Sequence, residues 1–259
     1  MAASPGKRST SWTNSGVHSP DEIDGAGGKN SSGARRRGMI YGRRSGHKLR
    51  QSQAALVENL LPQLHLTPEQ LHETAREDLF PKPVTDIWLE IGFGGGEHLA
   101  WQADHNRNVG CIGIEPFTNG VAKLLTAIDE QDLDNVRIFD GDARLMLAAL
   151  PDEFLSRAFV LFPDPWHKKR HNKRRIVNVD TLTQLHRAMK PGGELRIASD
   201  IPDYVRWILS HIRRVPGFVW TAEKPSDWRV RPDDWPMTRY EQKALREGRP
   251  PAYLSFRKA

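Results

Sequence analysis

A glycine-rich run, LEIGFGGGE at residues 89–97, follows a predicted strand and could do chemistry. Glycines at such a turn let the backbone bend tightly and approach a ligand where any Cβ would collide. The spacing is G-x-G-x-G, and an acid, Glu90, stands two residues before the first glycine. A dinucleotide-binding turn has G-x-G-x-x-G and would require glycine where Glu97 stands. The run therefore predicts a nucleotide-type site and disfavours hydride transfer, although a glycine turn can also serve packing alone.

Two further acids follow neighbouring predicted strands, because Glu115 closes the second strand and Asp142 comes just after the third. The carboxyl ends of parallel strands form the ligand-binding edge of an open α/β sheet. A carboxylate after the second strand can accept hydrogen bonds from both ribose hydroxyls, and one after the third can accept from an adenine amino group. Glu90 and the glycine backbone can hold an ammonium. S-adenosylmethionine carries all of these groups and is the cofactor we expect, whereas each acid taken singly could cap a helix or be a solvated loop charge.

After the fourth predicted strand the chain runs FPDPWHKKRHNKRR, residues 162–175, with six Lys or Arg in the last eight positions. Two prolines fix the backbone around Asp164, Trp166 offers a stacking face, and the cations can contact phosphates. A solvated helix start would account for the cations but not for an acid locked between prolines at a strand's carboxyl end. His167 and His171 are spaced i, i+4, but no cysteine or third histidine lies near them, so we expect no metal.

These residues need a sheet to bring them together, and alternating apolar runs and amphipathic segments from Val84 onward predict one. The last two predicted strands have no long helix between them. We therefore expect an α/β fold with a doubly wound, seven-stranded, Rossmann-like sheet and an antiparallel C-terminal strand. The predicted strands lie near 85–91, 109–115, 135–140, 157–162, 193–199, 217–222 and 252–257, and the predicted helices at 96–105, 118–131, 142–149, 176–189 and 202–214.

The N-terminal region differs in composition from the rest. Residues 1–38 are rich in Gly, Ser, Asn and Arg with few large apolar residues, which predicts a disordered basic tail. Residues 39–83 form an N-terminal extension in which apolar residues recur at helical spacing from Arg50 to Leu61, so we expect a peripheral helix there. Residues 84–259 form the predicted α/β domain.

The net charge of +6 comes from the N-terminal region, since residues 1–50 hold ten Lys or Arg and three Asp or Glu. Any nucleic-acid surface on the remainder must come from local clustering of charge. No apolar run approaches the roughly 18 residues of a membrane span and no secretory signal is evident, so we expect a soluble, cytoplasmic protein. The single cysteine, Cys111, lies in an apolar run and is expected in the core.

Six motifs over about residues 84–257 carry a family resemblance: EIGFGGGE, GIEPF, GDAR, FPDPWHKKRHNKRR, ASD at 198–200 and TRYEQKALREG at 238–248. Together they resemble the bacterial single-subunit tRNA (guanine-N7-)-methyltransferases. This resemblance implies that residues 84–259 are a methyltransferase domain with the seven-stranded, Rossmann-like S-adenosylmethionine-dependent methyltransferase fold. The resemblance implies transfer of the methyl group of S-adenosylmethionine to N7 of a variable-loop guanosine, position 46, in tRNA, which forms 7-methylguanosine. Pro116 and Phe117 stand where many members have Val-His, which leaves the adenosine-side contacts open.

The resemblance also implies roles for individual residues. Guanine N7 is an unprotonated nucleophile at neutral pH, so methyl transfer needs alignment more than a base. We expect the catalytic residue, Asp164, to accept hydrogen bonds from guanine N1–H and the exocyclic amine and to offset the charge that develops on the ring. The implied cofactor-binding residues are Glu90, Gly92, Gly94, Glu115, Pro116, Asp142, Ala143 and Asp164; the substrate-binding residues are Lys168, Asp200, Thr238, Arg239, Tyr240 and Glu241; and the RNA-backbone contacts are Lys169, Arg170, Lys173 and Arg174.

Some of these assignments have alternatives. Asp200 precedes an Ile-Pro pair and could cap the next helix. Thr238 and Glu241 have the spacing of a capping box. For the chain as a whole, the alternatives are a methyltransferase of another RNA or a small molecule, and a non-catalytic RNA-binding module of the same fold. We expect tRNA and no membrane as partners, and the sequence leaves monomer and homodimer open.

Overall fold

The computed structural model describes residues 41–259, so the predicted tail at 1–38 lies outside the described residues. One seven-stranded sheet has the order β3-β2-β1-β4-β5-β7-β6. Strands β1 to β5 pair in parallel, whereas β7 is antiparallel to both β5 and β6. The predicted fold class is confirmed. The strands are β1 (Asp86–Ile91), β2 (Val109–Ile114), β3 (Val136–Phe139), β4 (Leu155–Leu161), β5 (Met189–Ser199), β6 (Phe218–Trp220) and β7 (Ala252–Lys258).

Helices cover both faces of the sheet, as a parallel sheet requires. Apolar residues of α6 (Ala143–Ala149), α7 (Val179–Ala188) and α8 (Pro202–Ile212) form the larger core with one face. The second core lies on the other face, under α4 (Glu97–His105) and α5 (Thr118–Gln131). Every residue of β2 is buried between the two. Cys111 is fully buried there as expected, and burial raises the pKa of its thiol far above the usual range.

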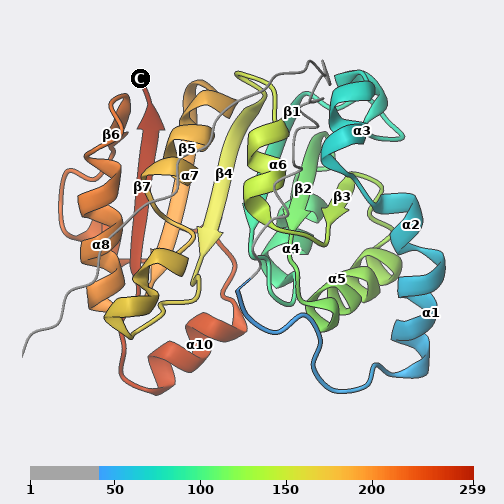
Figure 1. Ribbon diagram of the computed structural model, residues 1–259, viewed down its shortest axis with the longest axis horizontal. Coiled ribbons are helices and arrows are strands. Elements are labelled where there is room, and N and C mark those ends of the chain that lie inside the picture. The colour runs from blue at the N-terminus through green and yellow to red at the C-terminus, as the bar shows by residue number, and fades with distance from the viewer. Residues whose placement is uncertain (1–40) are drawn as a thin grey trace, which may run out of the picture. The chain divides into compact units, whose positions relative to one another are not determined.

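The extension before β1 packs on the edge of the sheet formed by β3. It contains α1 (Gln51–Asn59), α2 (Leu61–Leu64), α3 (Pro68–Glu73) and the 3-10 turn η1 (Arg76–Asp78). Helix α1 lies beside α5 (Figure 1), and the backbone N–H of Leu66 donates to the carbonyl of Ile138 over 2.9 Å. The sequence predicts one helix from Arg50 to Leu61. In the structure this helix, α1, ends earlier, at Asn59, and the separate short helix α2 follows it.

Three helical elements that the sequence patterns did not predict lie in the C-terminal half. They are the 3-10 helix η2 (Lys169–Arg174), α9 (Ser226–Arg229) and α10 (Arg239–Arg246). In Figure 1 strand β4 points to the lower edge of the molecule, where α10 lies, while β7 runs upward. Within residues 41–259 no helix is both long and apolar enough to cross a membrane.

Candidate active site

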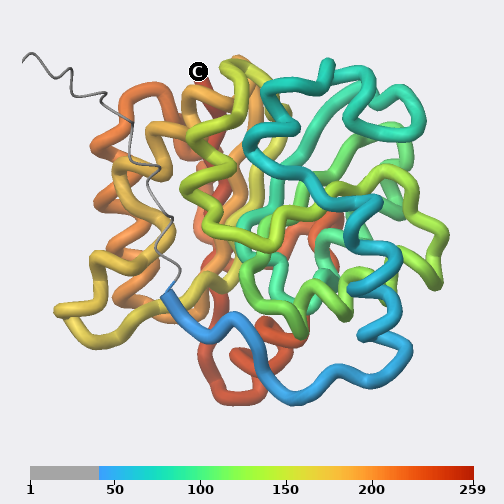
Figure 2. The backbone as a smooth tube through the Cα atoms, turned by 45° about the vertical axis from the view of Figure 1, so that its right-hand side comes forward, coloured from blue at the N-terminus to red at the C-terminus, as the bar shows by residue number. Residues whose placement is uncertain are grey.

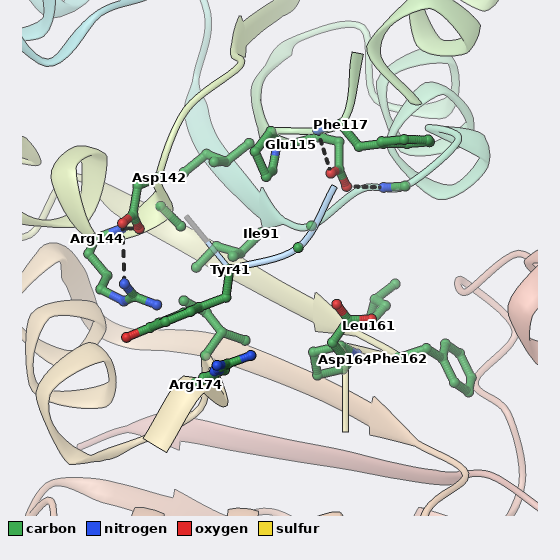
Figure 3. Close-up of a pocket in the computed structure, with 18 of the residues that line it drawn as sticks. Tyr41, Ile91, Glu115, Phe117, Asp142, Arg144, Leu161, Phe162, Asp164 and Arg174 are labelled. Atoms are coloured by element: carbon green, nitrogen blue, oxygen red, sulfur yellow. Dashed lines mark hydrogen bonds and ion pairs between the residues drawn. The ribbon is translucent and has the colours of Figure 1, made fainter. Parts of the chain in front are cut away.

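A pocket of about 320 Å³ lies at the carboxyl ends of strands β1 to β4. Residues from all four strand ends line it, together with residues of the N-terminal segment (Figure 3). Tyr240 of α10 also lines the pocket. This is the edge at which the sequence predicts a ligand, and the size is typical of a small-molecule site.

The glycine turn between β1 and α4 forms one wall. Gly92, Gly94 and Gly96 have φ of 74°, 58° and 79°, in the left-handed region where other residues are strained. Gly120, in the first turn of α5, approaches so closely that a Cβ there would overlap the carbonyl oxygen of Gly94. The patterns singled out the turn but not Gly120, because a glycine inside a helical run carries no signal of what it faces.

Glu115, after β2, is tied to this turn. Its Oε2 accepts from the Gly94 N–H over 2.8 Å and its Oε1 from the Phe117 N–H over 3.0 Å. Burial raises the pKa of its carboxyl, as do the negative charges of Asp164 and Glu90, while the two amide bonds act in the opposite direction. Pro116 also lines the pocket.

Asp142, after β3, both lines the pocket and caps α6. Its Oδ1 accepts from the backbone N–H of Arg144 over 3.0 Å, and its Oδ2 lies 3.2 Å from the Arg144 guanidinium. The N-cap alternative is thus correct for this residue without removing it from the site. Ala143 lines the pocket beside it.

The loop after β4 brings Asp164 to the pocket. Among the residues that the structure describes, its carboxylate has no hydrogen-bond or ion-pair partner. The surrounding protein removes part of its hydration and thereby raises its pKa. Phe162 and Trp166, on either side, have φ of 49° and 46°, which costs on the order of 1–3 kcal/mol each and is typical of functional sites.

Arg175 holds this loop in place. Its side chain is 1% exposed, its Nε donates to the Pro165 carbonyl over 2.8 Å, and its Nη2 lies 2.6 Å from Asp203. The guanidinium also stacks over the rings of Tyr204 and Trp207, 4.8 and 4.9 Å from their centroids. The last cation of the basic run is therefore a structural residue, a role that its sequence context did not reveal.

The remaining cations of the run are accessible. Lys168, which precedes η2, and three residues of η2 are exposed, whereas Arg174 is half-buried, lines the pocket and stacks over Trp166 at 5.0 Å. Burial and these cations lower the pKa of His171. No group of three or more potential metal ligands occurs in residues 41–259. The three exposed residues of η2 are Lys169, Arg170 and Lys173.

Glu90 differs from its prediction because its side chain does not line the pocket. It is buried behind the glycine turn, with Oε2 2.7 Å from Nδ1 of His98 on α4. Side chains alternate along a strand, so Glu90 points to the face covered by α4. Glu90 therefore lies one layer behind the residues that line the pocket, and its contact with the cofactor's ammonium stays a prediction.

Asp200 does not cap α8, so that alternative is wrong. The N-cap position belongs to Ile201, with no side-chain cap, and Asp200 Oδ2 lies 2.7 Å from Nε of Arg249. Asp200 does not line the pocket either.

The segment Thr238 to Glu241 divides into two parts. Thr238 Oγ1 accepts from the Glu241 N–H over 3.2 Å and so caps α10. The reciprocal half of the predicted capping box is absent among the described residues, because the buried Glu241 carboxylate accepts instead from Tyr253 Oη, 2.6 Å away.

The two residues between them are placed differently. Tyr240 lines the pocket against Gly94, and Arg239 forms an ion pair with Glu97 of α4.

The sequence analysis missed the wall formed by Tyr41, Gly42 and Arg43. The Tyr41 ring lies between two guanidinium groups, those of Arg144 at 5.4 Å and Arg174 at 5.0 Å (Figure 3). The following residues dock on the start of α5, where the Thr118 N–H donates to the Arg44 carbonyl over 2.9 Å. Figure 2 shows this blue segment crossing the lower edge of the molecule. It has no apolar periodicity that could have revealed it.

Comparisons with known proteins match this chain to methyltransferases. A family model described as "Putative methyltransferase" matches residues 85–253. The tRNA (guanine-N(7)-)-methyltransferase of Rhodospirillum rubrum is 53% identical over 222 residues, which cover 85% of this chain and 87% of that protein. The protein of the same name from a Ruegeria species is 47% identical over 237 residues, covering 90% and 92%. The solved 16S rRNA methyltransferase KamB has a TM-score of 0.50 at 15% identity, covers 74% of this chain and 92% of that one, and shares the fold alone.

Proposed function

The chain belongs to the tRNA (guanine-N(7)-)-methyltransferase family, and from this we propose that it transfers the methyl group of S-adenosylmethionine to N7 of a guanosine in tRNA. The observation that carries the proposal is 53% identity over 85% of the chain to a protein of that name. We further propose the variable-loop guanosine at position 46 as the target and the cytoplasm as the place of action.

The pocket residues fit S-adenosylmethionine. At Gly92 and Gly94 no Cβ stands between the backbone and the pocket, so a ligand can approach the turn closely. Each oxygen of Glu115 accepts one backbone amide, which leaves lone pairs for the two ribose hydroxyls. Asp142 would accept from the adenine amino group, with Pro116 and Ala143 beside the ring. The bound cofactor supplies an electrophilic methyl group on a positively charged sulfur.

Asp164 is the catalytic residue of this proposal. Guanine N7 carries a free lone pair, so the chain needs to align it and exclude water rather than remove a proton. An unpartnered carboxylate at the pocket can accept hydrogen bonds from guanine N1–H and the exocyclic amine. Its negative charge then offsets the positive charge that develops on the guanine ring. The prolines and the buried Arg175 keep this carboxylate in place before the RNA arrives.

The tRNA backbone would lie along η2. Lys169, Arg170 and Lys173 are exposed and form no ion pair with described residues, so they are available to phosphates. In the sequence, Lys168 lies between Asp164 and these cations, and we propose that it contacts the target nucleotide. Arg174, which lines the pocket, would contact a phosphate or stack near the target base.

The C-terminal substrate residues would act in two ways. Tyr240 faces the pocket and offers a stacking surface for guanine. The neighbouring Arg239 forms an ion pair with Glu97 of α4 and so holds the start of α10, and with it Tyr240, against the glycine turn. Thr238 and Glu241 fix the first turn of α10 and so place that tyrosine. Asp200 holds Arg249, which follows α10 in the chain.

The test uses purified protein and S-adenosylmethionine with a radiolabelled methyl group. Two tRNA transcripts are compared that differ only by guanosine or adenosine at position 46. We expect label in the guanosine transcript alone, with strand scission there after borohydride and aniline, which is specific for 7-methylguanosine. Glu58→Gln, a neutralised exposed acid on α1, should behave like the wild type and serves as a matched control. Labelling of neither transcript would contradict the proposed function.

A further inference from the structure

A buried pair of polar side chains, Glu90 and His98, lies directly behind the glycine turn. The two are 3% and 1% exposed, and Oε2 of the glutamate is 2.7 Å from Nδ1 of the histidine. The ring packs edge-on against Phe159, with centroids 4.6 Å apart. A buried carboxylate in such surroundings is costly unless a donor faces it, and the histidine is that donor.

The neighbours of His98 define which ring nitrogen carries the proton. Gln102 Nε2 donates to the backbone carbonyl of Asp234 over 2.8 Å, and because a carbonyl only accepts, this end of the side chain is the amide nitrogen. The same nitrogen lies 3.2 Å from His98 Nε2. That ring nitrogen therefore accepts, and the imidazole is neutral with its proton on Nδ1, directed at Glu90.

The pair consequently keeps a net negative charge. No lysine or arginine in the described part of the chain forms an ion pair with Glu90, and a neutral histidine does not cancel its charge. That charge reaches the pocket, since it is one of the causes that raise the pKa of Glu115. A fixed negative charge behind the turn favours a positively charged ligand over a neutral one of the same shape.

We infer that His98 is a positioning residue, which holds the Glu90 carboxylate fixed behind the glycine turn and so makes the pocket prefer the positively charged methyl donor. The inference rests on the proposed function, because it takes S-adenosylmethionine as the donor. Gln102, also on α4, completes the arrangement: the carbonyl of Asp234, in the segment that leads into α10, orients its amide, and that amide fixes the histidine tautomer.

The experiment measures, by calorimetry at pH 7, the affinity of the full chain for three ligands that share an adenosine. These are S-adenosylmethionine with its sulfonium, S-adenosylhomocysteine with a neutral sulfur, and 5′-methylthioadenosine, which lacks the amino-acid group. For His98→Leu we expect about tenfold weaker binding of S-adenosylmethionine, a smaller loss for S-adenosylhomocysteine and less than about twofold for 5′-methylthioadenosine. His98→Asn, whose Nδ2 can take the place of Nδ1, should restore most of the preference.

Glu90→Gln provides a second variant that keeps the volume and an acceptor for His98 while it removes the charge. It should show the same selective loss, and adding His98→Leu to it should cause no further change in selectivity. Equal losses for all three ligands, or none, would overturn the inference, because a merely structural residue affects their shared adenosine alike. Failure of the wild type to bind S-adenosylmethionine would overturn the proposed function as well, so the two failures are distinguishable.

Discussion

Replacement of Arg175 by methionine tests whether this arginine supports the loop of Asp164 or contacts RNA. The variant loses a charged hydrogen bond to Pro165, an ion pair with the exposed Asp203, and stacking on two rings. A hydrogen bond to a charged group contributes about 1.5–3 kcal/mol, an exposed ion pair about 0–1, and each ring contact about 0.5–1. Since methionine retains part of the packing, we expect a loss of about 3 kcal/mol in the free energy of unfolding, or roughly 6–12 °C in Tm.

The catalytic consequence follows from the position of Asp164 next to Pro165. A misplacement of about 1 Å in a reacting group can cost on the order of 100-fold in rate, so kcat should fall by up to that factor. Affinity for tRNA and its salt dependence should not change, because the buried guanidinium is inaccessible to phosphate.

The assay combines single-turnover methylation below the melting transition with tRNA binding at several salt concentrations. Arg175→Lys, which keeps the charge without the planar fork, should resemble the methionine variant more than the wild type. Lys173→Gln is the matched control from the same run and should lower the salt slope with little effect on Tm. The reasoning is refuted if Arg175→Met keeps kcat and lowers the salt slope by the equivalent of one phosphate contact.

Four further results are expected. Asp164→Asn should reduce single-turnover methylation by about 10²–10³ without weakening tRNA binding, and retention of most of the rate would show that its charge is not used. Partial desolvation raises the pKa of Asp164, so on acidification its carboxylate gains a proton at a higher pH than an ordinary aspartate does. We therefore expect kcat to begin to fall at a pH above the usual aspartate range, and Asp164→Asn to abolish this acidic limb of the pH profile. Neutralising Lys169, Arg170 and Lys173 together should flatten the dependence of log affinity on log salt by about 2–3 units, and an unchanged slope would place the RNA elsewhere. Gly120→Ala should weaken S-adenosylmethionine binding about tenfold or more in calorimetry while tRNA binding stays within about twofold, since the new Cβ displaces the Gly94 carbonyl of the turn.

The central strands could be predicted because their sequences form buried apolar runs, and β1 and β2 each differ from the predicted range by one residue at one end. Strand β5 begins at Met189, before its predicted start, because Met189 already pairs with Leu155 of β4. Lys190 to Gly193, which look like a turn in sequence, occupy an irregular stretch in which the register of the two strands shifts before Glu194 pairs with Arg157. Helix α10 was not predicted, since its polar composition gives weak apolar periodicity.

The acids of the candidate site could be predicted because they follow strands, and strand ends meet at one edge. Side-chain direction could not be predicted, and so Glu90 was expected in the pocket rather than behind it. Nor does composition distinguish Arg175 from its neighbours, because only tertiary packing buries one cation of the run and leaves the others in solvent.

The pocket wall at Tyr41 also has a consequence for the order in which the protein is made. Tyr41 leaves the ribosome before Arg174, on which it stacks and which follows 133 residues later in the chain. At a synthesis rate of about 5–20 residues per second, it waits on the order of 10 s for this contact partner. This wall of the pocket is therefore completed only after Arg174 has been made, by a segment that was synthesised well before it.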